Sequence, residues 1–189
     1  MDDTTLRKNL DNHFQAIDLC VGHRLNMPTL ILTYSAIDFL AWLGRPEEKP
    51  DVDKRTFVAW AHQYIVAPGF SQCEAADLYS ARCAHLHSNA YESKMTRSGE
   101  AAAVLYAWGA AKPQNMLTAL RKLGREKVKV VHLDELVAAI KKGAQQFLAD
   151  AVLDEHRWSL ILTRSAMFFD ENPELDRHID MFAASNTQS

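Results

Sequence analysis

Apolar residues recur every three or four positions along much of the chain, which is the spacing of amphipathic helices. The first such stretch, residues 4–22, places five apolar side chains on one helix face: Leu6, Leu10, Phe14, Ile17 and Val21. Similar stretches, bounded by glycine, proline or polar cap residues, predict helices over residues 28–43, 53–65, 74–87, 134–153 and 155–169. Asp134 is expected to cap the helix that it begins.

The pattern changes in the second half of the chain. Residues 88–99 are polar and mixed, which predicts a loop, while Lys127–His132 alternates and is rich in valine, as a strand does. Residues 102–108 fit either a strand or a short helix, and Gln114–Leu123 has a helical pattern. The sequence therefore predicts a small two-stranded sheet whose strands are joined by a helix.

Composition favours one mostly α domain. The 189 residues include only 7 glycines and 6 prolines, fewer than a turn-rich β fold needs. We expect a single helical domain over residues 1–182 and a flexible, small and polar tail over residues 183–189. The most apolar stretch, residues 28–43, is too short to span a bilayer and contains Asp38, so no membrane association is expected.

Charge and cysteine content restrict the chemistry further. The formal net charge of −3 provides no overall attraction for nucleic acid, so any RNA binding must be local. The three cysteines, Cys20, Cys73 and Cys83, are odd in number and have no C-x-x-C spacing. A disulfide framework or a zinc site is therefore not expected, and a cytoplasmic location is the simplest. The chain also has no P-loop and no G-x-G-x-x-G motif, so nucleotide hydrolysis and dinucleotide chemistry have no support.

The candidate chemistry lies in the six residues from Arg82 to His87, within the predicted helix 74–87. Arginine offers a rigid fork of donors for phosphate oxygens, and histidine is the side chain best suited to move protons near neutral pH. On an ideal helix His85 lies about 60° from Arg82, and His87 lies about 140° from it. Arg82 and His87 can therefore act together only if the helix ends near His87 or if a second subunit supplies one of them.

The Arg-x4-His pattern of Arg82 and His87 resembles the motif of the HEPN superfamily, whose enzymatic members cleave RNA. Across roughly residues 28–136 the chain is also similar to a group of uncharacterised bacterial proteins of this size. That similarity is carried by Tyr34–Asp38, Leu78–Cys83 and Leu105–Gly109. The resemblance implies a HEPN-like helical bundle that forms a homodimer, in which two motifs meet in one cleft.

The resemblance also implies a function. It predicts an endoribonuclease, acting as a toxin or in phage defence, that needs no metal or other cofactor. Arg82 would bind the phosphate and His87 would serve as base or acid, with His85, Asp38 and Cys83 as candidate supporting residues. The implied partners are RNA, a second copy of the chain, and an antitoxin or a nucleotidyltransferase. The sequence departs from the motif of active HEPN members at Cys83, because those members often have a polar residue directly after the arginine.

A structural interpretation of the same residues stays open. Arg82 can pair with Asp38 or Asp77, and His85 and His87 can cap the C-terminus of their helix. Asp38 lies among apolar residues and needs a partner if it is buried. Cys83 and the negative net charge favour a non-catalytic HEPN-like binding or regulatory module. A structural helical dimer, in which Arg82 and His87 stabilise the interface, is a second alternative.

Two further groups of residues have a simple interpretation. The basic run of residues 121–129 is expected to be a solvated face; its members are Arg121, Lys122, Arg125, Lys127 and Lys129. The tryptophans are expected to anchor the core; they are Trp42, Trp60, Trp108 and Trp158.

Overall fold

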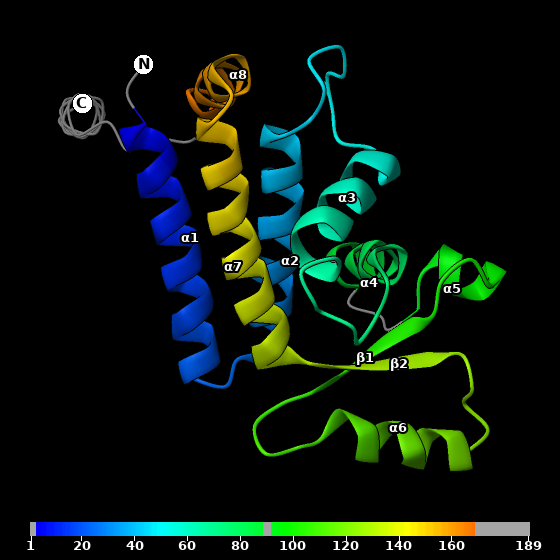
Figure 1. Ribbon diagram of the computed structural model, residues 1–189. Helices are drawn as coiled ribbons and strands as arrows, with labels where there is room; N and C mark the ends of the chain where they lie inside the picture. The colour runs from blue at the N-terminus through cyan, green and yellow to red at the C-terminus, as the bar shows by residue number, and fades with distance from the viewer. Residues whose placement is uncertain (1–2, 89–91, 169–189) are drawn as a thin grey trace, which may run out of the picture.

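The fold is mostly helical, as predicted, with one small sheet. The computed structural model describes residues 3–88 and 92–168. Helices α1 (Thr4–Gly22), α2 (Asn26–Leu43) and α7 (Leu133–Val152) stand side by side and contact one another in each pairing (Figure 1). Helix α8 (Glu155–Ser165) follows α7 at the upper end of this view. The buried apolar residues form one core that runs from Leu6 to Leu162.

The predicted third helix changes its geometry before it ends. Helix α3 (Lys54–Ala61) is capped by Asp53, whose carboxylate accepts a hydrogen bond from the Thr56 amide at 2.7 Å. The chain then continues as a π-helical turn, η1 (His62–Val66), which the sequence pattern did not indicate. A Cβ atom on Gly143 of α7 would lie 2.5 Å from the Tyr64 carbonyl oxygen, so only glycine allows α7 to approach this turn so closely.

The predicted two-stranded sheet is confirmed. Strands β1 (Ala103–Ala107) and β2 (Val128–His132) are parallel and paired from Ala103↔Val128 to Ala107↔His132. Helix α6 (Pro113–Lys122) joins them and contacts both. In Figure 1 the sheet crosses the lower end of the bundle, with α6 on the side away from the helices. Helix α4 (Ala75–Ser88), which carries the candidate motif, contacts α2, α3 and β1.

Two local predictions were wrong. The segment predicted as a loop over residues 88–99 contains a short helix, α5 (Lys94–Ser98), which begins with a capping box between Ser93 and Thr96. A helix of five residues is too short to show an apolar period, so only its cap could have indicated it. Asp134 does not cap α7, because His132 occupies the cap position and Asp134 lies in the first turn.

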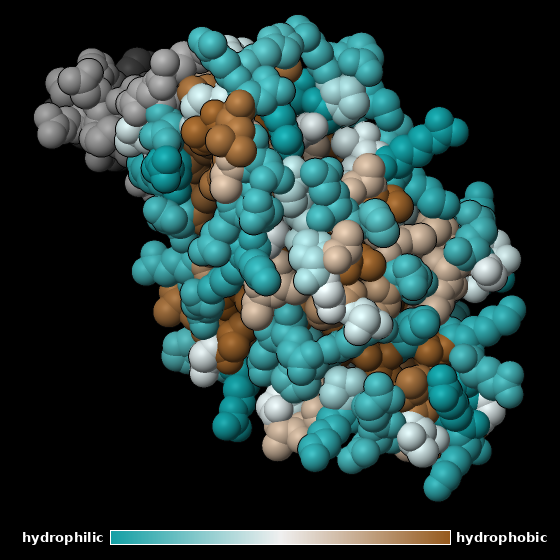
Figure 2. All heavy atoms as spheres, in the orientation of Figure 1, coloured by the Kyte–Doolittle hydropathy of each residue, from teal (hydrophilic) through white to brown (hydrophobic). Residues whose placement is uncertain are grey.

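The surface matches most of the sequence expectations. The face shown in Figure 2 is mainly hydrophilic, with small separate hydrophobic areas. All five residues of the basic run are exposed, as predicted for a solvated face. Trp108 is 52% exposed, so its assignment to the core was wrong, whereas Trp60 is buried. None of the helices in residues 3–88 and 92–168 is long and apolar enough to cross a membrane. The predicted tail, residues 183–189, lies outside the described residues.

Replacing Gly143 tests the contact between α7 and η1. We expect Gly143→Ala to lower the free energy of unfolding by about 1–3 kcal/mol, because the new methyl group meets backbone that cannot rotate away. The control is Gly22→Ala, where a Cβ atom meets nothing within 4 Å, and stability should be unchanged or slightly higher. Urea denaturation measures both variants. Equal midpoints for Gly143→Ala and the wild type would contradict the close approach.

Candidate functional site

The site centres on an ion pair between α4 and α2. Arg82 Nε donates a hydrogen bond to Asp38 Oδ2 at 2.7 Å, and both side chains are about a quarter exposed, at 24% and 23%. Of the two partners considered from the sequence, Asp38 is therefore the one that Arg82 contacts. Asp77 has another role, because its carboxylate accepts hydrogen bonds from the amides of Glu74 and Ala102. Asp77 thus fixes the start of α4 beside the chain that leads into β1.

The ion pair forms part of the wall of a pocket of about 310 Å³. Helix spacing explains the wall: Ser35, Asp38, Phe39 and Trp42 lie on one face of α2, at steps of three and four residues. Helix α4 adds Tyr79 and Arg82, which are one turn apart, and Val52 completes the lining from the loop after α2. The result is a pocket with three aromatic side chains around a fixed arginine and carboxylate.

Electrostatics keep the pocket groups in defined protonation states. Burial lowers the pKa of Arg82, but the hydrogen bond and the charge of Asp38 raise it, and the balance leaves it above its ordinary value. The guanidinium is therefore a permanent cation. Burial raises the pKa of Tyr79, and the thiol of Cys83, hydrogen-bonded to the Tyr79 hydroxyl, raises it further. Cys83 thus contacts both Tyr79 and Arg82, and Tyr79 stays a neutral phenol near neutral pH.

His85 lies in the core and does not line the pocket. Its side chain is 5% exposed and packs between the rings of Tyr34 and Tyr106, with ring centroids 6.0 and 5.4 Å away. The two tyrosine hydroxyls share a hydrogen bond of 2.5 Å, and neither nitrogen of His85 has a hydrogen-bond partner. His85 therefore does not cap its helix, and burial lowers its pKa.

The backbone places His87 in the last turn of the helix that carries the motif. Helix α4 includes His87 and ends at Ser88. On an ideal helix the positions of Arg82 and His87 are about 140° apart around the axis. The side chain of His87 lies outside the part of the chain that the structure describes. A composite site between two subunits remains the prediction.

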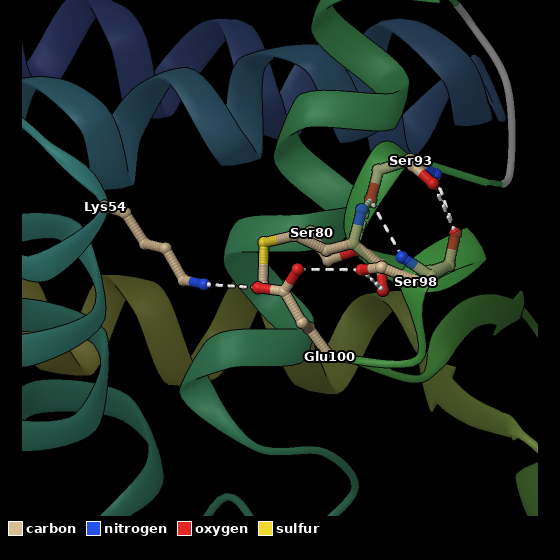
Figure 3. A network of polar contacts seen from close by, with 7 residues as sticks. Lys54, Ser80, Ser93, Ser98 and Glu100 are labelled. Atoms are coloured by element: carbon tan, nitrogen blue, oxygen red, sulfur yellow. Dashed lines mark hydrogen bonds and ion pairs between the residues drawn. The ribbon is translucent and has the colours of Figure 1, made fainter.

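A polar network, missed by the sequence analysis, fixes the chain where it returns from the motif (Figure 3). Ser80 of α4 and Ser93, the cap of α5, share a hydrogen bond of 2.7 Å between their hydroxyls. At the end of α5, Ser98 donates to Glu100, whose carboxylate pairs with Lys54 of α3 at 3.2 Å. These contacts join α3, α4 and α5, and the Ser93–Thr96 capping box was their only sequence signal.

Comparison with known proteins finds no matching family model, no matching curated protein and no matching solved structure. Within residues 3–88 and 92–168, no cluster of three or more His, Cys, Asp or Glu side chains is placed to hold a metal ion.

A double-mutant cycle tests the ion pair. We expect Asp38→Asn and Arg82→Gln to be non-additive, with a coupling free energy of about 1–2 kcal/mol, because the pair is largely removed from water. The control cycle, Lys54→Gln with Glu100→Gln, joins two side chains that are about half exposed, at 46% and 56%. Its coupling should stay below about 0.5 kcal/mol. Additive effects of Asp38→Asn and Arg82→Gln would show that the pair does not form in solution.

The burial of His85 predicts a pH dependence of stability. Its folded pKa lies below the unfolded value of about 6.5, so its stabilising contribution is complete above that pH and is lost as the pH falls through the folded pKa. His85→Phe removes the titrating group. Between pH 7.5 and 5.5 this variant should lose less stability than the wild type, by up to about 1.4 kcal/mol.

Urea denaturation at the two pH values measures the difference. Burial also lowers the pKa of His13, so the stability of His85→Phe should still fall somewhat as the pH is lowered. His23→Gln, which removes an exposed imidazole, is the control and should keep the wild-type slope. If the unfolding free energies of His85→Phe and the wild type changed equally with pH, the burial of an unpaired His85 would be contradicted.

Proposed function

We propose that the protein is a metal-independent endoribonuclease of the HEPN type that acts as a homodimer. The observation that carries the proposal is the placement of Arg82, which Asp38 holds in the wall of an aromatic pocket. A fixed arginine suits a phosphodiester, and aromatic walls suit unstacked bases of single-stranded RNA. The resemblance of Arg82 and His87 to the HEPN motif supplies the second part of the reasoning.

The proposed reaction uses the nucleophile that RNA itself contains. His87 takes the proton of the 2′-hydroxyl, and the 2′-oxygen attacks the neighbouring phosphorus while the bond from phosphorus to the 5′-oxygen breaks. Arg82 stabilises the extra negative charge on the phosphorane. Proton transfer to the leaving 5′-oxygen gives a 2′,3′-cyclic phosphate and a 5′-hydroxyl. DNA lacks the 2′-hydroxyl and is not a substrate.

Asp38 acts as a positioning residue in this proposal. Its carboxylate binds Nε, which fixes the plane of the guanidinium relative to α2. The carboxylate also removes part of the positive charge, so the site attracts RNA less strongly than an unpaired arginine. A role as a toxin or in phage defence, with an antitoxin or a nucleotidyltransferase as partner, rests on the family resemblance alone.

The alternative is a non-catalytic HEPN-like binding or regulatory module. The Asp38–Arg82 ion pair favours it, because an arginine already paired with a carboxylate is also what a structural role requires. The two proposals differ in one simple outcome. Only the enzyme produces RNA fragments with 2′,3′-cyclic phosphate ends in the presence of EDTA.

Cleavage of single-stranded RNA in EDTA tests the function. Arg82→Ala and His87→Ala should each lower the rate by on the order of a hundred- to ten-thousand-fold, whereas His85→Ala should retain much of it. Arg82→Lys should cleave faster than Arg82→Ala but more slowly than the wild type, because the lysine ammonium lacks the bidentate fork of arginine. Circular dichroism must first show each variant folded. A requirement for Mg²⁺ would contradict the mechanism, and activity that depends on His85 but not His87 would contradict the residue assignment.

Mixing two inactive variants tests the composite site. If each site takes Arg82 from one subunit and His87 from the other, a mixed dimer of Arg82→Ala and His87→Ala has one intact site. Equal mixing after mild dissociation should then recover about a quarter of wild-type activity, since half of the dimers are mixed and each has one site of two. No recovery, with mixed dimers shown by mass spectrometry, would contradict a site shared in this way.

A further inference from the structure

A second pocket has a volume of about 330 Å³. The end of α2, the loop after it, α3, η1 and the start of α8 form its lining. Three basic residues contribute to the lining, Lys49, Arg55 and Arg157, and no carboxylate does. It shares no residue with the pocket around Arg82.

The structure holds one of these cations in place. Arg157 donates from Nη2 to the Tyr64 hydroxyl at 2.9 Å, and its guanidinium carbon lies 5.3 Å from the centre of the Phe147 ring. Gln63 donates to the same hydroxyl at 3.0 Å. Tyr64 and Gln63 both belong to the π-helical turn, and such turns occur frequently at functional sites. The turn therefore places two polar side chains beside Arg157.

The nearby carboxylates leave one cation uncompensated. Asp53 accepts a hydrogen bond from Lys49 at 2.8 Å, and Glu47 lies 3.2 Å from His156. Arg55 is exposed and has no ion pair or hydrogen bond with any side chain in residues 3–88 and 92–168. The pocket thus combines a fixed guanidinium, an unpaired guanidinium and an ammonium, which is a donor set for an anion.

Trp60 provides an independent indication of a ligand. It also lines the pocket and is 5% exposed, yet its buried indole N–H has no acceptor. A buried donor without a partner is costly, and an unfilled ligand site is one explanation for it. The ring of Trp60 also gives the pocket an apolar wall suited to the organic part of a ligand.

We propose that this pocket binds a phosphate monoester, with its phosphate between Arg55 and Arg157 and its organic part against Trp60. Arginine forks match phosphate oxygens, and no lining carboxylate repels them. The volume suits one small molecule of mononucleotide size. The same chemistry occurs in a free nucleoside monophosphate and at the 5′-phosphorylated end of an RNA. Neither Arg82 nor RNA cleavage takes part in this binding.

Isothermal titration calorimetry with the full chain tests the proposal. AMP should bind at least ten-fold more tightly than adenosine, which lacks the phosphate. Arg55→Gln should weaken AMP binding at least ten-fold without affecting folding, because Arg55 is exposed and makes no described contact. Arg157→Gln should weaken it too, and Arg97→Gln, at an exposed site on α5, is the matched control that should bind like the wild type.

A second pair of ligands separates the two sources of the phosphate. A short 2′-O-methyl RNA, which cannot be cleaved through its 2′-oxygen, is titrated with and without a 5′-phosphate. Binding of AMP alone assigns the pocket to a free nucleotide, and binding of the phosphorylated oligomer alone assigns it to an RNA end; either result supports the proposal. Three results would overturn the proposal: no effect of the phosphate on affinity in either pair of ligands, no binding of either phosphorylated ligand, or wild-type affinity of Arg55→Gln for the phosphorylated ligand that binds.

Discussion

The contact between α2 and α4 determines where each described candidate group lies. Asp38 and Tyr34 are one turn apart on α2, and Arg82 and His85 are one turn apart on α4. They form two neighbouring contacts between the helices: an ion pair near the surface and a ring stack in the core. The first leaves Arg82 in the wall of a pocket, and the second removes His85 from water. One helix packing thus gives two residues of the same short motif opposite environments.

The core contact constrains the ion pair energetically. Tyr34, His85 and Tyr106 join α2, α4 and β1, so a shift of α4 along α2 would displace His85 from the two tyrosine rings and would also separate the ion pair. Both tyrosines have pKa values raised by burial and remain neutral, which suits an apolar core. The neutral cluster therefore supports the helix register, and the hydrogen bond and charge of Asp38 offset the desolvation of Arg82.

Sequence patterns predicted those parts of the fold that depend on long runs of residues. The longer helices and the sheet followed from the spacing of apolar residues, whereas the five-residue helix α5 did not. The π-helical turn has no such pattern, and its close contact with Gly143 joins residues far apart in the chain. The same limit applies to the site. Helical spacing separated His85 from His87 around the axis, but only the packing against Tyr34 and Tyr106 shows that His85 is buried.

The two pockets use arginine in different ways, and this difference bears on what each can bind. In the first, Asp38 fixes Arg82 and partly neutralises it, so binding there must draw on aromatic contacts as well as charge. In the second, a neutral hydroxyl from Tyr64 fixes Arg157, which keeps its full charge for an anion. A neutral partner thus orients an arginine without reducing its attraction for an anion, whereas a carboxylate orients the arginine but reduces that attraction. In the two proposals made above, the first arrangement would serve a transient contact with a reacting phosphate, and the second would hold a ligand that stays bound.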